Sequence, residues 1–288
     1  MNRTNPKVTV GIPVFNGQDF IRLAVKSVLN QTYSDFELII TDDGSTDDSV
    51  KIIQSFDDPR IRIISDGENM GISFRLNQQI SLAKGEFFIR MDADDIMMPD
   101  RIERQIKYLE KHPDVDLIGG AAIIIDNHNK IIGDRHSAVE KRLTLQSWLV
   151  GDSFIHPTVA GKISFFQRHM YESEYKGIED QDLWFRASQD SVMVQLAQYY
   201  IFYRDPLSFK LNTYLFRRKQ NRKFWRSKKV KETVGKSICR KMILKCYIKS
   251  VLSIIANYTG TSKIIISRRN KVNGNIDQKY QNYINSLQ

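Results

Sequence analysis

At 288 residues, with 41% apolar and 26% charged side chains, the chain has the composition of a folded protein that can form one large domain plus an appendage, or two modest domains. No run approaches the roughly 18 apolar residues of a membrane-spanning helix, and residues 1–7 lack the apolar stretch of a signal peptide. We therefore expect a cytoplasmic protein in which Cys239 and Cys246 are reduced thiols.

Charge is divided unevenly along the chain. Residues 1–216 carry 24 Lys and Arg against 31 Asp and Glu, a balance of −7, whereas residues 217–288 carry 19 against 2, a balance of +17. An acidic front is thus joined to a basic tail, and such asymmetry is typical of two separate roles. The sequence predicts a catalytic domain at 1–216 and a basic helical tail at 217–288.

The front of the chain alternates strand and helix patterns. Apolar, β-branched runs predict strands at residues 8–14, 36–41, 60–65 and 86–91. Apolar residues at helical spacing predict helices at residues 20–29, 50–56, 72–83 and 101–111. This alternation favours a mostly parallel, doubly wound α/β sheet flanked by helices. Residues 115–204 are less regular, with one further strand pattern at 117–126.

Polar and acidic side chains follow three of the predicted strands. Phe15-Asn16 follows the first strand, Asp42-Asp43 the second, and Asp92-Ala93-Asp94 the fourth. In doubly wound sheets, ligands bind outside the carboxyl ends of the strands. We therefore expect these side chains to converge on one edge of the sheet.

The pair Asp92 and Asp94 has the pattern of a metal site. Alternation sends both carboxylates to the same side, and Mg²⁺ and Mn²⁺ prefer oxygen ligands, commonly one or two carboxylates together with substrate phosphates. Such a pair suits a metal-bound diphosphate. The alternative is a set of turn and capping residues before Pro99.

Two other acidic pairs have both a functional and a structural interpretation. Asp42 and Asp43 could accept hydrogen bonds from a nucleobase, or could belong to a turn and helix cap. Asp180, next to Glu179, could act as the general base that deprotonates an attacking hydroxyl. The alternative is a helix start in which the following apolar residues, including Trp184, supply the core.

In order and spacing, these motifs resemble the family 2 glycosyltransferases, which have the GT-A fold. The resemblance covers about residues 7–205. It is carried by Pro13-Val14-Phe15-Asn16-Gly17, Gln31-Thr32-Tyr33-Ser34-Asp35-Phe36-Glu37, Asp42-Asp43-Gly44-Ser45-Thr46-Asp47-Asp48, Ala83-Lys84-Gly85-Glu86-Phe87, Asp92-Ala93-Asp94-Asp95, Met98-Pro99-Asp100-Arg101 and Glu179-Asp180. It implies inverting transfer from a nucleotide-diphosphate sugar, assisted by Mn²⁺ or Mg²⁺, of the bacterial surface-polysaccharide type. A UDP-sugar donor is expected from the family.

The resemblance also implies roles for individual residues. Asp180 would be the general base with Glu179 beside the acceptor, and Asp94 the direct metal ligand with Asp92 close to the metal and the ribose. The implied donor site comprises Pro13, Phe15, Asp42, Asp43, Arg75, Asp92, Ala93, Asp94 and Arg204. The acceptor-side candidates are His156, Trp184 and Asp95.

The chain departs from the family pattern after Tyr203-Arg204. Many members carry a His two residues after this Arg, whereas here Asp205-Pro206 follows. A donor-closing role for this loop is therefore in doubt, although Arg204 could still neutralise the diphosphate.

The basic tail has three interpretations. It could lie on an anionic membrane surface, with Phe224 and Trp225 as interfacial anchors, and bring the enzyme to a lipid-linked acceptor. It could pack on the acidic domain as an ordinary solvated helical face. Nucleic-acid binding is not expected, because no recognised module accompanies the charge. The first interpretation predicts a peripheral protein on the cytoplasmic face of a membrane.

Three rival functions fit the sequence less well. A sugar-1-phosphate nucleotidyltransferase would need a Gly-rich, basic loop after the first strand, where the chain has Phe15-Asn16-Gly17-Gln18. A phospho-acceptor receiver domain would leave the downstream acidic clusters unexplained. A catalytically silent membrane- or carbohydrate-binding homologue is disfavoured by the intact Asp94 and Asp180.

Overall fold

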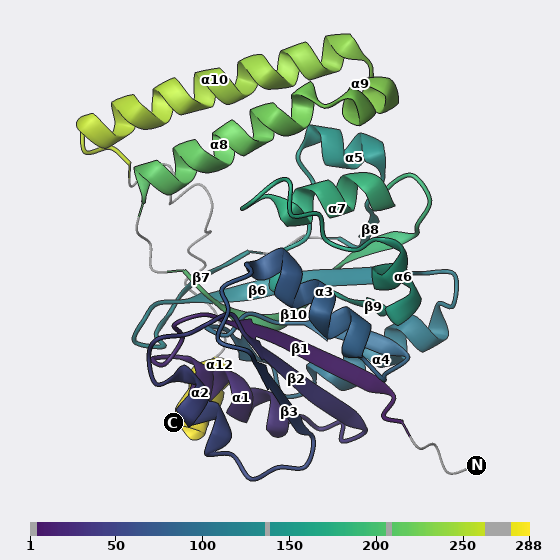
Figure 1. Cartoon of the computed structure of the whole chain (residues 1–288), viewed down its shortest axis with the longest axis vertical. Coiled ribbons are helices and arrows are strands. Elements are labelled where there is room, and N and C mark those ends of the chain that lie inside the picture. Colours follow the sequence, from purple (N-terminus) through teal and green to yellow (C-terminus); the bar gives the residue numbers. More distant parts are fainter. Residues whose placement is uncertain (1–4, 136–138, 206–208, 263–277) are drawn as a thin grey trace.

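The computed structural model describes residues 5–135, 139–205, 209–262 and 278–288 (Figure 1). The strands are β1 (Val8–Val14), β2 (Phe36–Asp42), β3 (Ile61–Ser65), β4 (Phe87–Arg90), β5 (Ile96–Met97), β6 (Leu117–Ile125), β7 (Ile131–Arg135), β8 (Lys141–Arg142), β9 (Ala160–Lys162) and β10 (Met193–Arg204). The helices are α1 (Ile21–Leu29), α2 (Ser49–Gln54), α3 (Ile72–Leu82), α4 (Arg101–Lys111), α5 (Leu145–Val150), the 3-10 turn η1 (His156–Thr158), α6 (Ile163–Arg168), α7 (Glu179–Ala187), α8 (Leu211–Arg226), α9 (Lys228–Val234), α10 (Lys236–Tyr258) and α12 (Gln278–Leu287).

One central sheet organises the described residues. Its strand order is β3-β2-β1-β4-β9-β6-β10-β5, with β7 beside β6 and β8 beside β10. The strands from β3 to β4 are parallel, as the alternating pattern predicts, and β6 pairs in parallel with β10. The three-residue β9 runs antiparallel between β4 and β6, and makes the second half of the sheet mixed. The predicted α/β class is confirmed.

Helices cover both faces of the sheet, and a core lies beneath each layer. On one face, α1, α2 and α4 bury their apolar sides against alternate residues of β1 and β2. On the other face, α3, α6 and α7 enclose a second core that contains Phe88 and Trp184. Apolar residues at helical spacing supply both layers, because only one stripe of each helix must leave water.

The parallel register brings the predicted ligand-binding edge together. Val14 at the end of β1 lies beside Asp42 at the end of β2, and Met91 after β4 donates a backbone hydrogen bond of 3.1 Å to Gly11. The segments that carry Phe15 and Asp92 therefore leave the sheet at the same edge. This confirms the expected convergence of the three strand ends.

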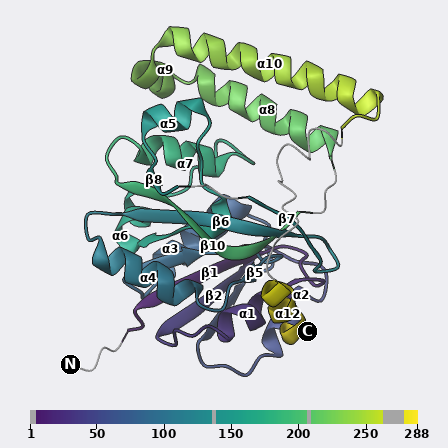
Figure 2. The same cartoon turned by 180° about the vertical axis from the view of Figure 1, so that it is seen from behind.

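Helices α8, α9 and α10 form a layer over α5 and α7, and both views show it above the sheet (Figures 1 and 2). Phe224 and Trp225 are buried, at 2% and 3% exposure, and pack on Trp148 with ring centroids 5.9 and 5.4 Å away. The predicted role of these two residues as membrane anchors is therefore wrong, since they belong to the core beneath α8. The spacing of aromatic residues along a helix is the same whether their face contacts lipid or protein, so the sequence alone could not distinguish the two.

The two cysteines of this layer agree with the packing interpretation, whereas apolar residues on the outer side of α10 stay exposed. Cys239 and Cys246 are free and buried, as expected for reduced thiols. Within the described residues, no helix has the length and apolar character needed to cross a membrane.

The chain end returns to the sheet through α12. Ile284 and Leu287 pack against β5, β6 and β10, and the Lys26 Nζ donates a 2.8 Å hydrogen bond to the Leu287 carbonyl. The predicted boundary at residue 216 falls within α8, and α12 contributes to the core of the sheet. The division into 1–216 and 217–288 stays a prediction.

Replacing Ile284 should test whether α12 belongs to this core. Ile284→Ala removes a fully buried side chain and leaves a cavity, so the free energy of unfolding should fall by about 2–4 kcal/mol. Ile255→Ala is the matched control, because Ile255 is 52% exposed on α10 and its loss should change stability by less than about 0.5 kcal/mol. Urea unfolding followed by circular dichroism measures both. Equally small effects would contradict the docking of α12.

Candidate active site

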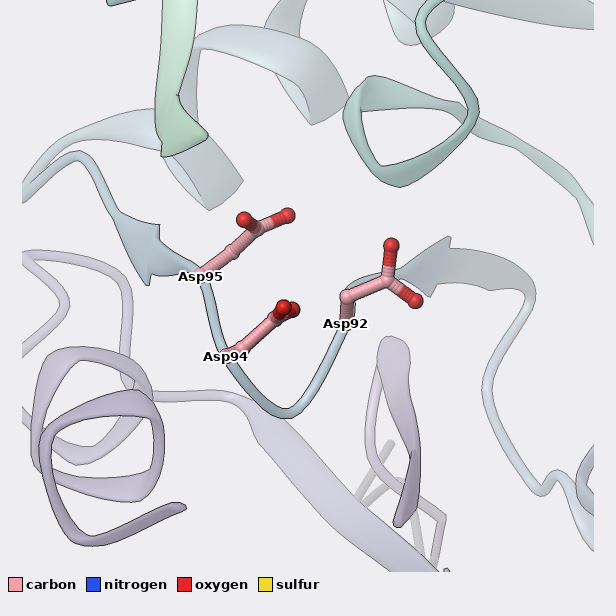
Figure 3. A group of neighbouring side chains, drawn as sticks. All are labelled: Asp92, Asp94 and Asp95. Carbon is pink, nitrogen blue, oxygen red and sulfur yellow. The ribbon is translucent and has the colours of Figure 1, made fainter. Parts of the chain in front are cut away.

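Three aspartates lie on the loop between β4 and β5. Ligand oxygens of Asp92, Asp94 and Asp95 all lie within 4.8 Å of one another. Figure 3 shows the Asp94 and Asp95 carboxylates extending to the same side of this loop. Asp94 is exposed, whereas Asp95 is buried and its Oδ2 has no hydrogen-bond partner among the described residues. This set of hard oxygen donors, with one orphaned oxygen, fits Mn²⁺ or Mg²⁺.

The electrostatics of this acidic loop favour a bound cation. Desolvation, followed by repulsion from Asp92, raises the pKa of Asp94 to about 6. Burial and the neighbouring Asp94 raise the pKa of Asp95 well above its usual range. A divalent cation would offset this mutual repulsion and favour the ionised carboxylates. The residues present therefore suit such an ion.

Arg90 fixes the first aspartate of the loop. Its guanidinium is almost fully buried and engages both Asp92 oxygens, with Nη1 2.8 Å from Oδ2 and Nη2 2.5 Å from Oδ1. Such two-point pairs are strong and directional. The sequence prediction missed Arg90. It precedes Asp92 by two residues, so strand alternation places both side chains on the same side.

Arg204, at the end of β10, holds the same loop from behind. Its Nε donates to the Asp94 carbonyl at 2.8 Å, and its backbone N–H donates to Asp95 Oδ1 at 2.9 Å. The guanidinium lies over the Phe20 ring, 4.2 Å from the centroid, and the residue is only 5% exposed. It is thus committed to the loop backbone. Residues 206–208 of the predicted donor-closing loop lie outside the described residues.

Asp43 and Arg75 form a second buried pair at the end of β2. Asp43 Oδ1 accepts hydrogen bonds from the backbone N–H groups of Met70 and Gly71 at 2.8 and 3.0 Å, and from Arg75 Nε at 3.0 Å. Arg75 is fully buried and also pairs with Asp66 at 2.6 Å. The guanidinium nitrogens of Arg75 bond to protein groups. Arg75 would therefore influence a ligand only by holding Asp43 in position.

The rest of the predicted donor side lies on neighbouring turns. Asp42 accepts a 3.1 Å hydrogen bond from the Ser45 backbone N–H and a 2.9 Å bond from the Ser65 hydroxyl. Phe15 is 52% exposed directly after β1, which includes Pro13. An exposed aromatic ring beside these carboxylates suits a planar ligand.

A cleft of about 380 Å³ joins the acidic loop to α7. Arg90 and Asp92 line it, as do Glu179 and Asp180 in the first turn of α7. Burial and the adjacent Glu179 raise the pKa of Asp180 to about 6, which Arg90 and Arg217 partly oppose. A carboxylate with such a pKa is suited to accepting a proton near neutral pH. The cleft therefore brings Asp92 and the predicted base Asp180 to one space, whereas Asp94 is not among its lining residues.

The two acceptor-side aromatic candidates lie at different depths. His156 lines the cleft, and its Nε2 lies 2.8 Å from the Tyr171 hydroxyl. Desolvation and the charge of Arg90 lower the pKa of His156 well below its usual range, so its ring is neutral. Trp184 is 1% exposed and lies behind this wall, with its ring centroid 5.9 Å from that of His156.

Two basic residues of α8 also line the cleft. Arg217 and Arg218 face the side that holds Asp180. The sequence prediction placed both residues in the tail. The one sequence signal for a role in the site is that they directly follow the predicted boundary at residue 216. The first turns of the tail therefore complete the cleft.

Comparisons with known proteins agree with this geometry. The sequence model described as "Glycosyl transferase family 2" matches residues 9–170, more than half of the chain. The chain belongs to glycosyltransferase family 2. This membership favours the glycosyltransferase class over the nucleotidyltransferase and receiver-domain alternatives.

Relatives carry the same family description. An uncharacterized glycosyltransferase of Haemophilus influenzae is 29% identical over 211 residues, which are 69% of this chain and 65% of the relative. The putative glycosyltransferase EpsE of Bacillus subtilis is 30% identical over 190 residues, 64% of this chain and 67% of that protein. The matched part thus spans about two thirds of these relatives.

Solved structures share the GT-A fold. TarS 1–349 of S. aureus, in complex with UDP-GlcNAc, gives a TM-score of 0.61 at 18% identity over 84% of this chain and 73% of that one. The mannosyltransferase PcManGT of Pyrobaculum calidifontis, in complex with GDP-Man and Mn²⁺, gives 0.58 at 14% identity over 99% and 86%. At these identities the likeness establishes the fold.

Proposed function

We propose that this protein is a metal-dependent inverting glycosyltransferase that moves a sugar from a nucleotide-diphosphate sugar, a UDP-sugar, to a hydroxyl of a glycan or lipid-linked acceptor in surface polysaccharide biosynthesis. The observation that carries the proposal is the single cleft lined by Asp92 and Arg90 on one side and Asp180 on the other. Donor complexes of similar folds, with UDP-GlcNAc in TarS and GDP-Man in PcManGT, support the donor class.

The donor would lie along the edge where β1, β2 and β4 end. Phe15 would stack on the nucleobase, with Pro13 beneath it, and the carboxylates of Asp42 and Asp43 would accept base N–H groups. Arg75 would act as a positioning residue, because its buried guanidinium holds Asp43. Asp92 and Ala93 would lie along the ribose and diphosphate.

The diphosphate would lie at the acidic loop. Asp94 would hold Mn²⁺ or Mg²⁺ with help from Asp92, while Arg204 keeps the loop in place through the Asp94 carbonyl. The bound cation supplies Lewis-acid stabilisation of the charge on the departing diphosphate. Asp95, predicted on the acceptor side, is fully buried and accepts a hydrogen bond from the Arg204 backbone N–H, so it would support the loop without contacting the acceptor.

Asp180 would remove the proton from the acceptor hydroxyl. The hydroxyl oxygen would then form the new bond to the anomeric carbon, while the bond to the diphosphate breaks and its electron pair leaves with the nucleotide. A single in-line displacement inverts the anomeric centre. Glu179 would face the acceptor, neutral His156 would offer it a hydrogen bond, and Trp184 would support His156 from the core.

Replacing Asp94 should remove the metal requirement together with most of the activity. Asp94→Ala is expected to lower kcat by about 10²–10³-fold, because charge stabilisation by a bound cation contributes several kcal/mol. The exposed Asp35 offers a control, and Asp35→Ala should leave turnover unchanged. Transfer or hydrolysis of a panel of nucleotide sugars, with Mn²⁺ or EDTA, measures both. Metal-dependent turnover that survives in Asp94→Ala would exclude this ligand, and no turnover by the wild type with any donor would favour a catalytically silent homologue.

Replacing Asp180 should separate donor binding from transfer. Asp180→Asn is expected to keep nucleotide-sugar affinity while transfer falls by about 10²–10⁴-fold, the usual loss for a general base. Because only the ionised carboxylate accepts a proton and its pKa is about 6, wild-type kcat/KM should fall as pH drops through 6, about tenfold per unit below it. Asp114→Asn on the exposed surface serves as control. Full transfer by Asp180→Asn would remove it as the base.

We further infer that α10 rests on an anionic lipid surface, which would make the enzyme peripheral on the cytoplasmic face of a membrane. Exposed apolar residues at helical spacing form a stripe along α10, and the exposed Arg240 and Lys241 lie on the same helix near its start. The stripe comprises Leu244, Ile248, Val251, Leu252 and Ile255, each 51–60% exposed. It replaces Phe224 and Trp225 as the predicted membrane contact.

Vesicle binding tests this surface. Wild-type protein should bind phosphatidylcholine vesicles that contain phosphatidylglycerol at low salt and dissociate at high salt. Ile248→Gln/Leu252→Gln should bind at least about tenfold more weakly, because two apolar side chains no longer leave water. Val150→Gln, which changes an exposed apolar side chain on α5, should bind normally. Failure of the wild type to bind at low salt would refute the membrane contact.

A further inference from the structure

A second cavity lies beside the catalytic cleft, between α8 and α10 on one side and α5 and α7 on the other. Its volume is about 210 Å³, several times the roughly 30 Å³ that one water occupies. We call it the basic pocket. Its defining residues are Arg218, Lys245, Lys249, Gln181, Trp148 and Trp225. The three cations come from α8 and α10.

The cations of the basic pocket lack anionic partners within the described part of the chain. Arg218, Lys245 and Lys249 make no ion pair there, and the buried Arg218 Nε has no hydrogen-bond partner. Asp152 also lines the pocket, but it pairs with Lys141 at 2.6 Å.

The same cations repel one another. Desolvation, followed by the charges of Arg218 and Lys245, lowers the pKa of Lys249. Holding like charges together costs Coulomb energy, which a bound anion would reverse. Lys245 and Lys249 are four residues apart on α10, so both reach the same side of the helix.

The basic pocket adjoins the catalytic cleft. Arg218 and Gln181 line both spaces. Gln181 follows Asp180 directly, and its backbone N–H donates a 2.8 Å hydrogen bond to the Asp180 carboxylate. The three cations therefore lie in the space adjacent to the one that holds Asp180.

We propose that the basic pocket binds a phosphate or diphosphate group of the acceptor, so that the substrate class is a phosphate-bearing glycan carrier and not a neutral glycan. This inference rests on the proposed transferase function, in which Asp180 activates the acceptor hydroxyl. Arg218 lines both spaces and would bind the anion near the reacting hydroxyl. Lys245 and Lys249 would donate further charge-assisted hydrogen bonds to it.

Binding of inorganic pyrophosphate to the full-length protein tests the pocket directly. EDTA is present throughout, so that no metal on the acidic loop holds the diphosphate. Calorimetry should show Lys245→Gln/Lys249→Gln binding about tenfold more weakly than the wild type, since two charged donors are lost. Its thermal stability should not fall, because the change relieves repulsion between cations.

The matched control is Lys229→Gln/Lys236→Gln, which removes the same charge from exposed positions of α9 and α10 outside the pocket. Its pyrophosphate affinity and its donor hydrolysis should equal those of the wild type. Equal weakening by both double variants would reduce the effect to net charge and overturn the proposal. Absence of pyrophosphate binding by the wild type would also overturn it.

Two vesicle arms identify where the phosphate resides. Phosphatidylcholine vesicles carrying a prenyl diphosphate are compared with vesicles carrying phosphatidylglycerol at equal charge. Stronger retention on the prenyl diphosphate, lost in Lys245→Gln/Lys249→Gln, supports a lipid-linked acceptor. Pyrophosphate binding without such a preference supports a soluble phosphorylated glycan.

Metal-dependent hydrolysis of nucleotide sugars by the wild type is measured separately. Turnover without pyrophosphate binding overturns the basic pocket alone. Pyrophosphate binding without turnover of any donor leaves the pocket as an anion site, but it refutes the transferase function and with it the assignment of the anion to an acceptor.

Discussion

Carboxylates gathered at the edge of a sheet repel one another, and buried guanidinium groups hold this edge together. Arg90 clamps Asp92, Arg75 clamps Asp43, and Arg204 fixes the backbone of the acidic loop. A fourth, Arg101, is fully buried and donates a 3.0 Å hydrogen bond to the Arg90 carbonyl. Removing one partner of such a pair would leave an uncompensated buried charge, which costs far more than losing a surface pair.

This framework positions the acidic groups before any ligand arrives. Asp92 is already paired with Arg90, which leaves Asp94 as the exposed carboxylate of the loop. Asp95 Oδ2 has no hydrogen-bond partner among the described residues, and the pKa of Asp94 is raised. Both observations show that the ionised carboxylates of this loop are electrostatically unfavourable without a ligand. Sites of this kind exchange stability for binding, because the ligand supplies the missing charge.

The donor edge could be predicted from the sequence, because strand length, strand ends and parallel pairing follow from local patterns. Runs such as residues 8–14 and 36–41 match β1 and β2 closely, and Asp43 follows β2 directly, as Asp92 comes just after β4. The middle section could not be predicted in this way. The strand β9 has three residues, too few to show a period, and its antiparallel pairing depends on contacts distant in sequence.

The sequence also left the partner of the tail open. Helical periodicity shows that Phe224 and Trp225 share a face, but it does not say whether protein or lipid covers that face. The partner is α5 and α7, across Trp148 and Phe185. The sequence pattern also does not show where α8 packs, so Arg217 and Arg218 were predicted to belong to the tail alone. The packing of α8 places both of them at the cleft.

The packing of α8 and α10 on α7 means that the two sides of the site come from distant parts of the sequence. The donor edge is built from residues before β6, whereas the wall behind Asp180 is completed by helices near the end of the chain. Substitutions in α8 and α10 can therefore reshape the acceptor side without disturbing Asp43 or Asp94. A lineage could in this way keep one activated sugar while it changes the molecule that receives it.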